Sequence, residues 1–410
     1  MIFQGRQFVP YLSLAYLGRG EPGENTPRRY CELMALMGQP RQWKEGRHLQ
    51  TFIWMVVGLI HSGCVSLTAW VPFVSRRARY AQSTQRRFAR GLANKRVEVH
   101  TLYAPLIQTA LAEWGSHTLY LALDTTRLWN RYCVIRLAVL YRGRAVPLVW
   151  TVLEHSSRSV AYAAYAALLE AVPPLWPRGI KIVFVADRGF ADTQLLAPVR
   201  RLGWHFRLRI KASFGVVHSG RRPCKVEDFH LAPGRALFLH HVAITADHFG
   251  PVSLALARHS HNGEYWYVVS DEPTSVQTFV EYGWRFDIEE NFLDDKSNGF
   301  PWESSLLGSA DAVACLGLVL AVTPLYLVAP GTPVVAAQQR RWGAPHWFRG
   351  NSYLRIGWQW VKTALARGWA LFATLHLSGA PDPEPARASV AQSEQAPPVT
   401  FTVTYFYPPV

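Results

Sequence analysis

The order of predicted strands and helices between residues 118 and 211 constrains the fold more than any other feature of the sequence. Three β-rich runs with short polar breaks come first, as in an antiparallel meander. A helix candidate that ends at Pro173-Pro174 follows, and then a short apolar run typical of a buried strand, a second helix and a further strand. In order, these elements are Thr118–Leu123, Val134–Tyr141, Ala145–Leu153, Arg158–Ala171, Ile180–Ala186, Ala191–Leu202 and His205–Lys211. The alternation predicts an α/β fold.

The order β-β-β-α-β-α-β is that of RNase H-like folds, so we expect an RNase H-like core. Residues 212–275 break this rhythm with Gly and Pro and hold further β-type runs, so we interpret them as a β-rich insertion. A helix is then predicted from Ser275 to about Lys296. Residues 380–399 are rich in Pro, Ala and Ser, a composition that predicts a disordered tail. The last ten residues are strand-like, without an assigned role.

A long apolar stretch raises the question of a membrane segment. From Ala312 to Gln339 there is no charged residue, and length alone would allow a span. Because Pro324 and Pro330 interrupt the stretch, we favour helices buried in a large core, with a membrane segment as the alternative. The N-terminus lacks the pattern of a signal peptide. Five scattered cysteines are typical of reduced thiols in a cytosolic protein.

Basic residues exceed acidic ones strongly. Lys and Arg number 43 and Asp and Glu 28, which gives a net charge of +15. Such an excess favours a polyanionic partner, most often nucleic acid. The segment Ser75–Arg96 holds eight basic residues and no acid. We interpret it as a helix capped by Ser83 or Thr84 whose basic residues contact DNA phosphates, foremost Arg86, Arg87 and Arg90. The alternative is a solvated basic face.

Two acidic residues follow apolar strands directly. Asp124 stands in LALDTT and Asp187 in VFVADRG, each at the predicted end of a strand. An acid in such a position is costly unless it is paired, hydrogen-bonded or bound to a metal. One such residue is more often a helix cap or a turn former. Two on neighbouring strands of one sheet favour a catalytic or metal site.

A third acid lies on the predicted helix after the insertion. Glu289 shares a stripe with Tyr282, Arg285 and Lys296, because spacings of 3, 4 and 7 residues place all four within an arc of roughly 60°. A helix that packs on a sheet would normally be apolar along that stripe. The alternative is a solvated face.

These residues resemble a known family. The pattern Tyr282-x2-Arg285-x3-Glu289-x6-Lys296 is similar to the Tyr-Arg-Glu-Lys signature of bacterial insertion-sequence DDE transposases of the group-four type. The Asp-Thr-Thr at 124–126 and the Asp-Arg-Gly at 187–189 resemble the first and second Asp motifs of that family. The resemblance covers about residues 50–320 and includes the β-rich insertion between the second Asp and the Glu.

The resemblance implies that Asp124, Asp187 and Glu289 are the catalytic and metal-binding acids. Phosphoryl transfer on DNA needs charge neutralised on both the attacking and the leaving oxygen, and two Mg²⁺ ions held by carboxylates about 4 Å apart do this. We expect Asp124 to bridge both ions, and Mn²⁺ to substitute for Mg²⁺. No Cys/His ligand set competes, so zinc is not expected.

The other signature residues suit a DNA substrate. Arg285 and Lys296 can hold phosphates, and Tyr282 can donate a hydrogen bond to one. The resemblance implies that Arg209 and Lys211, on the strand after the second Asp motif, contact transposon-end DNA; the alternative is an edge-strand charge pair. It also implies that a base flipped during hairpin formation stacks on Trp266, just before Glu272-Pro273. Core packing is the alternative for Trp266.

The sequence thus predicts a cut-and-paste DNA transposase that nicks a transposon end to leave a 3′-OH, forms a hairpin and joins target DNA. Expected partners are double-stranded DNA, as terminal inverted repeats and target, and a second copy in a homodimer, with no membrane and a cytoplasmic, nucleoid-associated location. The expected domains are a helical DNA-binding domain at 1–105, a catalytic domain at 106–330 and a C-terminal region at 331–410. Alternatives are a structure-selective RNase H-like nuclease and a non-catalytic DNA-binding relic.

Overall fold

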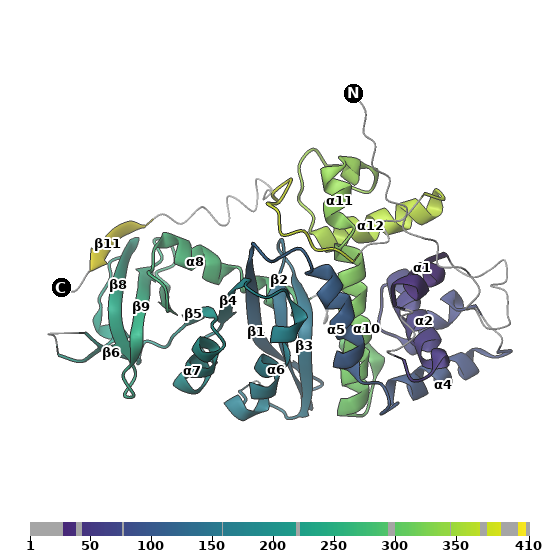
Figure 1. The fold of residues 1–410 in the computed structure, drawn as a ribbon, viewed down its shortest axis with the longest axis horizontal. Coiled ribbons are helices and arrows are strands. Elements are labelled where there is room, and N and C mark those ends of the chain that lie inside the picture. The colour runs from purple at the N-terminus through teal and green to yellow at the C-terminus, as the bar shows by residue number, and fades with distance from the viewer. Residues whose placement is uncertain are drawn as a thin grey trace.

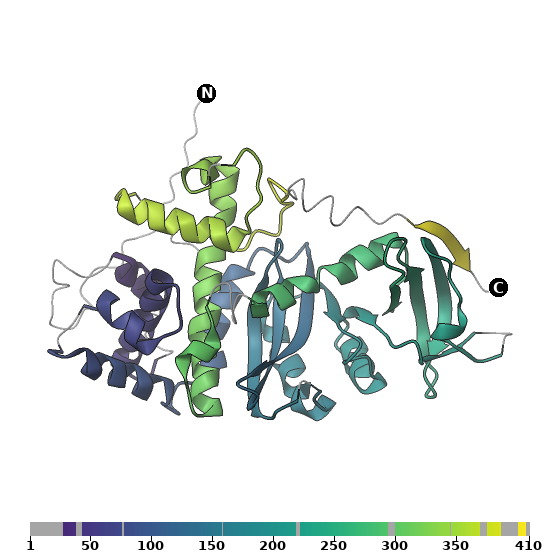
Figure 2. The same cartoon turned by 180° about the vertical axis from the view of Figure 1, so that it is seen from behind.

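The computed structural model describes residues 28–37, 43–75, 78–157, 159–218, 222–293, 300–344, 346–369, 375–386 and 401–406. Within them, one sheet of eleven strands runs from the middle of the molecule to one end, and helices occupy the other end (Figures 1 and 2). The strands are β1 (Thr118–Leu128), β2 (Tyr132–Leu140), β3 (Ala145–Glu154), β4 (Lys181–Ala186), β5 (His205–Arg209), β6 (Gly215–Val217), β7 (Cys224–Lys225), β8 (Arg235–Ile244), β9 (Phe249–Arg258), β10 (Tyr265–Ser270) and β11 (Thr402–Phe406). The fold is mixed α/β.

The strand order is β3-β2-β1-β4-β5-β10-β9-β8-β6-β7, and β11 pairs with β8. Strands β1, β2 and β3 form an antiparallel meander, whereas β4 is parallel to β1 and β5 is parallel to β4. Strand β10 then pairs antiparallel with β5, from Arg207↔Ser270 to Arg209↔Val268. Residues 212–275 therefore extend the same sheet with β6 to β10 and do not form a separate one.

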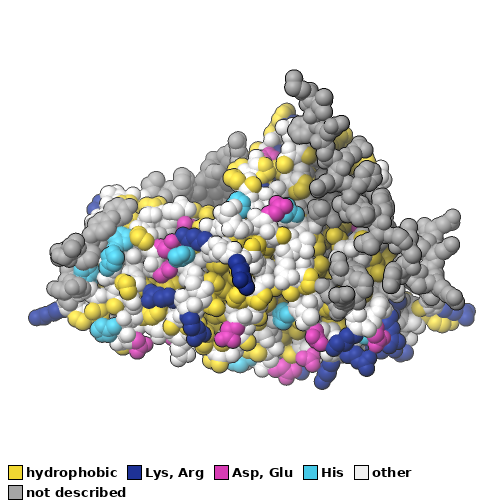
Figure 3. Space-filling model, in the orientation of Figure 1, with side chains coloured by type: hydrophobic (Ala, Val, Ile, Leu, Met, Phe, Trp, Pro, Cys, Tyr) yellow, Lys and Arg dark blue, Asp and Glu magenta, His cyan; other side chains and the backbone are white. Residues whose placement is uncertain are grey.

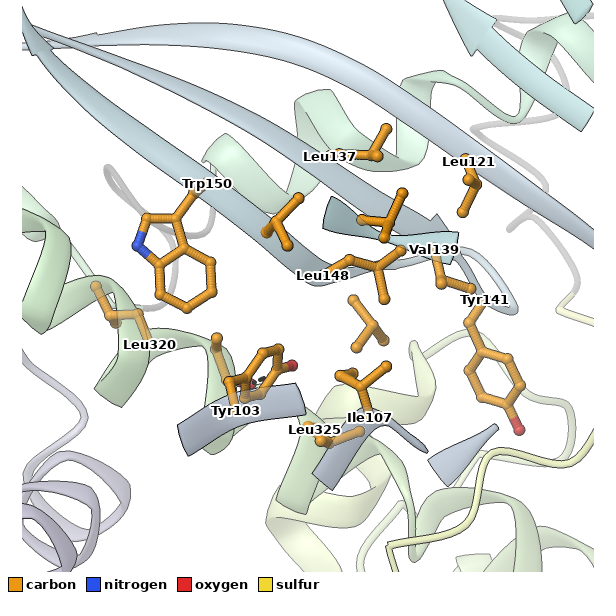
Figure 4. Packing of buried hydrophobic residues seen from close by; sticks show 14 of the residues in the cluster. Tyr103, Ile107, Leu121, Leu137, Val139, Tyr141, Leu148, Trp150, Leu320 and Leu325 are labelled. Atoms are coloured by element: carbon orange, nitrogen blue, oxygen red, sulfur yellow. Dashed lines mark hydrogen bonds between the residues drawn. The ribbon is translucent and has the colours of Figure 1, made fainter. Parts of the chain in front are cut away.

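Helices α5 (Val99–Ala110) and α10 (Ala310–Val328) pack on one face of the meander (Figure 4). Gly317 of α10 lies against the ring of Trp150, because an added Cβ would come within 2.4 Å of Nε1. That Nε1 donates a hydrogen bond to Ala314 O at 3.0 Å. The buried residues that meet in this layer include Tyr103, Ile107, Leu121, Leu137, Val139, Leu148, Leu320 and Leu325. Each large apolar side chain buried here contributes ~1.5–3 kcal/mol.

The apolar stretch that begins near Ala312 is helical. By length and composition, Ala310–Ala336 could cross a membrane, and 94% of its most apolar window is buried inside the structure. The segments Gly46–Ser62 and Leu67–Phe73 are long and apolar enough to cross a membrane only if they are counted as one, and a bend of 94° separates them. Helix α10 contacts β3, α2 (Gly46–Ser62), α5 and α12 (Tyr353–Ala366), so its apolar surface is covered by this chain's own residues.

The N-terminal described residues are helical: α1 (Arg28–Met37), α2 (Gly46–Ser62), α3 (Leu67–Trp70), the 3-10 turn η2 (Val71–Phe73) and α4 (Ala81–Leu92). Helix α2 is buried from Thr51 to Ile60 and contacts α1, α4 and α10. The expected cap of the basic helix was wrong. Helix α4 begins at Ala81 after Tyr80, so Ser83 and Thr84 lie within it. Thr84 instead shares the buried stripe of α4 with Phe88, one turn further on.

Between β3 and β5 the helices are shorter than predicted: η3 (Tyr162–Ala164), α6 (Ala166–Ala171), η4 (Pro173–Leu175) and α7 (Thr193–Arg201). Helix α7 begins two residues later than expected because Asp192 caps it, accepting a hydrogen bond from Gln194 N at 2.9 Å. The remaining 3-10 turns are η5 (Val226–Asp228), η7 (Trp302–Ser305) and η8 (Gln339–Trp342).

The single helix predicted from Ser275 to about Lys296 is two helices, α8 (Val276–Gly283) and α9 (Phe286–Leu293). The hydrogen-bond ladder changes at the break: Arg285 N donates to Tyr282 O and Ile288 N to Arg285 O, three residues back. Ile288 thereby packs between β1, β2 and β4 on the face opposite α10. Residues 294–299, which include Lys296, lie outside the described part of the chain.

The C-terminal region adds α11 (Gly331–Ala336) and α12 (Tyr353–Ala366), and it corrects one expectation. Residues 380–386 are not disordered. Glu384 accepts two hydrogen bonds from Arg340, at 2.9 and 2.7 Å, and Asp382 accepts one from Arg349 at 2.7 Å. Residues 387–400 are not described. The strand-like terminus forms β11, parallel to β8 and in register from Thr402↔Arg235.

Candidate active site

Asp124 and Asp187 lie side by side at one edge of the parallel strand pair. The register of β1 with β4 runs to Leu123↔Ala186, and each acid is the next residue along its strand. The expectation that Asp124 ends its strand was wrong: β1 continues to Leu128, because Thr125 and Thr126 keep pairing with β2. Only the pairing of β1 with β4 ends here, so both acids stand where the parallel pair of strands stops.

The break between α8 and α9 brings three further residues to the two acids. Arg285 Nη2 is 2.7 Å from Glu289 Oε1, and Arg285 Nη1 is 3.8 Å from Asp124 Oδ2. Arg285 Nε donates to the Tyr282 hydroxyl at 3.2 Å, and that hydroxyl donates to Asp187 Oδ1 at 3.4 Å. Five residues therefore form one connected polar group, which we call the acid–arginine group: Asp124 of β1, Asp187 directly after β4, Tyr282 of α8, Arg285 in the break and Glu289 of α9.

Burial sets the protonation of this group. The Asp124 side chain is 18% exposed and accepts a hydrogen bond from Thr125 N at 2.7 Å. Burial raises the pKa of Asp124 to about 6, and the nearby charges of Glu289 and Asp187 add to the rise, although Thr125 N and Arg285 oppose it. Burial likewise raises the pKa of Tyr282 to about 12, so its hydroxyl stays a donor.

The fit of a divalent metal can be tested on the same residues. Among the described residues, no three His, Cys, Asp or Glu side chains are grouped closely enough to hold a metal ion. Asp124 and Asp187 do offer neighbouring hard oxygen donors, and the raised pKa of Asp124 is that of a buried carboxylate short of positive charge. Glu289 is 47% exposed and bound to Arg285. The pair of aspartates fits Mg²⁺ or Mn²⁺, and Glu289 joins them only by leaving Arg285.

The two residues after the second Asp motif that were predicted to contact DNA, Arg209 and Lys211, have different surroundings. Arg209 ends β5 and follows the register pair Ala186↔Leu208, so it lies beside Asp187. The Nη2 atom of Arg209 is 2.7 Å from Glu264 Oε1. Strand β5 lies between β4 and β10, so Arg209 is not on an edge strand of the sheet. Lys211 is exposed beyond β5, in a turn where Phe214 N donates to its carbonyl.

Trp266 lies on β10, opposite Ala257 of β9. Its ring is partly buried and meets Phe279 of α8 edge-on, with centroids 6.2 Å apart. Phe279 belongs to a small apolar cluster with Tyr282, Val268 and Phe238. Packing against the helix that carries Tyr282 is thus observed for Trp266, while stacking on a base stays a prediction.

The predicted basic residues of the N-terminal region lie on α4. Arg86, Arg87 and Arg90 are exposed there. Arg86 and Arg90 lie opposite the buried stripe of Thr84 and Phe88, whereas Arg87 flanks it, with its guanidinium carbon 5.8 Å from the Phe88 ring centroid. Lys and Arg side chains gather at that end of the molecule (Figure 3). The described residues nearby include one acid that neutralises part of this charge, since Glu45 lies 3.0 Å from Arg96.

Sequence reasoning missed Arg207, which is 5% exposed. Its Nε donates to Glu281 of α8 at 2.9 Å, and its Nη2 donates to Glu272 at 2.6 Å. Glu281 directly precedes Tyr282, so this ion pair ties the site helix to β5. The available signal was the alternation in HFRLR, which puts Arg207 on the same sheet face as Arg209.

Comparison with known proteins gives little beyond this geometry. No protein-family model matches the chain, and no curated protein matches it. Among solved structures, the chain is similar to a piggyBac transposase in a synaptic complex with hairpin DNA. The identity is 11% and the TM-score 0.39, over 91% of this chain and 86% of that one.

Proposed function

We propose that this chain is a metal-dependent DNA transposase of the cut-and-paste type, related to the insertion-sequence enzymes whose signature it resembles. The observation that carries the proposal is the acid–arginine group. Asp124 and Asp187 are neighbours in the β1–β4 register, and Arg285 links Asp124 to Glu289. Two acids thereby lie side by side at the carboxyl end of the β1–β4 pair, and the third is connected to them through Arg285.

The strand order supports an RNase H-like core. Strands β3-β2-β1-β4-β5 follow the order of that fold, with the first three antiparallel and the last two parallel to β1. Strands β6 to β10 stand between β5 and α8, where the resemblance implies an insertion. Exposed basic residues on α4 support double-stranded DNA as the partner.

The chain's own residues prepare the site for its ligands. Mg²⁺, when bound, would neutralise charge on the attacking and leaving oxygens of a phosphodiester. Asp124 and Asp187 would hold it, and Glu289 would complete the site. Arg285, whose side chain is 4% exposed, holds Glu289 at 2.7 Å and lies 3.8 Å from Asp124, so it occupies the space between the two acids until a cation takes its place. The Tyr282 hydroxyl fixes the orientation of Asp187 through its hydrogen bond.

The proposal is tested with the purified protein, its flanking terminal repeats and Mg²⁺, with products separated on denaturing gels. Asp124→Asn, Asp187→Asn and Glu289→Gln should each abolish cleavage and leave end binding within a few-fold. Glu170→Gln, an exposed acid on α6, is the matched control and should cut normally. Near-native cleavage by any one of the three variants would refute the role of that residue.

One observation favours a second candidate, a structure-selective nuclease on the same fold. Trp266 packs on Phe279, a role that needs no flipped base. A nuclease would cut DNA but would not join a 3′-OH end to a target. Incubation of a precut transposon end with plasmid DNA distinguishes the two, because joined product requires strand transfer. A transposase should also pair two ends in a homodimer, which light scattering of the DNA complex measures.

A further inference from the structure

The C-terminal helical region has an unusual composition that the acid–arginine group does not explain. Residues 331–369 hold five Trp, six Lys or Arg, and no Asp or Glu. The acid-free run extends from Ala312 to Pro381. Basic residues without acids favour a polyanionic partner, and tryptophan adds a flat apolar face to the same segment.

The tryptophans at one part of this region face solvent. Trp347 is 87% exposed and Trp342 is 56% exposed. Each carries an arginine over its ring: the guanidinium carbon of Arg341 is 5.6 Å from the Trp347 ring centroid, and that of Arg367 is 4.9 Å from the Trp342 centroid. We call these four residues the Trp–Arg surface.

Buried arginines hold the loop that carries this surface. Arg340 donates to His346 O at 3.0 Å and to both carboxylate oxygens of Glu384. Arg349 donates to Asn351 O at 3.0 Å and to Asp382 at 2.7 Å. The loop is therefore ordered by contacts within the chain, and its exposed rings are positioned before any partner binds.

The same ion pairs leave the surface positive. Asp382 and Glu384 are used by buried Arg349 and Arg340, whereas no described acidic side chain forms an ion pair with Arg341 or Arg367. The exposed large apolar side chains in the described part of 331–369 are all aromatic. A membrane-binding face would also present aliphatic side chains. Flat rings with uncompensated guanidinium groups fit a partner that offers both π faces and negative charge.

We propose that the Trp–Arg surface binds unpaired nucleotides of DNA, with bases stacked on Trp342 and Trp347 and phosphates held by Arg341 and Arg367. Duplex DNA fits less well, because its bases are already stacked on one another. This inference goes beyond the proposed function and does not depend on it: the surface needs neither the acids nor a metal.

The test is fluorescence anisotropy with a labelled oligothymidylate of about 15 nucleotides, a length that matches common single-strand sites. The full chain is compared with the double variant Trp342→Ala/Trp347→Ala, which should bind at least about 30-fold more weakly if both rings stack on bases, or about 5-fold or more for each ring. The double variant with Tyr at both positions should stay within a few-fold of wild type. Arg235→Ala, on β8 at the far end of the molecule (Figure 1), is the charge control and should change nothing.

A second double variant, which removes the two positive charges and keeps both rings, keeps the test decisive if the alanine variant fails to fold. Arg341→Gln/Arg367→Gln should reduce the slope of log affinity against log salt by about 1.4, or roughly 0.7 for each phosphate contact to a single strand. Equal binding by all variants, or equal competition by duplex DNA of the same length, would overturn the proposal. Loss of binding to phosphatidylglycerol vesicles alone would assign the surface to a membrane instead. Asp124→Asn should bind the oligonucleotide normally, which separates this result from any failure of cleavage.

Discussion

The substitution Asp124→Asn should stabilise the protein in the absence of divalent cations. Burial raises the pKa of Asp124 from an ordinary value of 3.8 to about 6. At pH 7 the carboxylate is ionised in both folded and unfolded chains, so its charge destabilises the folded state by about 2.2 × 1.36, or about 3 kcal/mol. Asparagine keeps the shape of the side chain and removes that charge.

The sign of the effect fixes its pH dependence. A raised folded-state pKa means that the protonated acid favours folding, and this advantage is lost as pH rises from 3.8 through about 6. The gain from Asp124→Asn should therefore fall from about 3 kcal/mol at pH 7 to about 1.6 kcal/mol at pH 5. Urea unfolding at both pH values measures it, and Glu170→Gln is the control that should show neither effect.

Added Mg²⁺ provides the complementary result. A cation that binds only the folded chain stabilises it by RT ln(1 + [L]/Kd), so wild type should gain stability and Asp124→Asn should gain far less. If Asp124→Asn lowers stability at both pH values, Asp124 is a structural hydrogen-bonding residue and not an uncompensated carboxylate. If Mg²⁺ stabilises both proteins equally, the ion binds elsewhere.

Three further predictions concern other parts of the molecule. Arg207→Met should destabilise the fold by about 3–5 kcal/mol in urea unfolding, because it leaves Glu281, whose side chain is 15% exposed, without the Arg207 guanidinium, while Glu272 keeps Lys181; a loss below about 1 kcal/mol would make the ion pair incidental. Trp266→Ala should slow hairpin formation more than the first nick on a labelled transposon end, and Trp266→Phe should keep part of the activity; equal loss of both steps would assign the ring to packing alone. Neutralising Arg86, Arg87 and Arg90 of α4 together should reduce the slope of log affinity for duplex DNA against log salt by about 0.9 for each phosphate that they neutralise in the wild type. An unchanged slope would make these arginines a solvated face.

Local patterns were enough to anticipate much of the site. Apolar runs that stop at Asp124 and Asp187 mark the two strands whose carboxyl-end register brings the acids together. The spacing of Tyr282, Arg285 and Glu289 also gave the right contacts, although the helix breaks between the first and the third. The break keeps one tight turn there, so residues three and four apart still meet.

Long-range partners were invisible to the same reasoning. The composition of residues 380–386 resembles that of a disordered tail, yet Asp382 and Glu384 find buried arginines more than thirty residues upstream. Arg207 likewise meets Glu281 across 74 residues. Composition averages over neighbours in sequence, whereas a single ion pair with a distant buried group can order a whole segment.

The unbroken sheet has a mechanical consequence. Backbone hydrogen bonds join β1 to β4, β4 to β5 and β5 to β10, so no hinge separates the carboxylate edge from the strand that carries Trp266. The carboxylate pair and Trp266 are therefore parts of one rigid sheet, and the distance between them is fixed by the spacing of the strands. A DNA end that reaches both Asp187 and Trp266 must therefore supply the bending and unstacking itself. Sequences that deform easily next to the scissile phosphate should be processed faster, even where the protein touches no base.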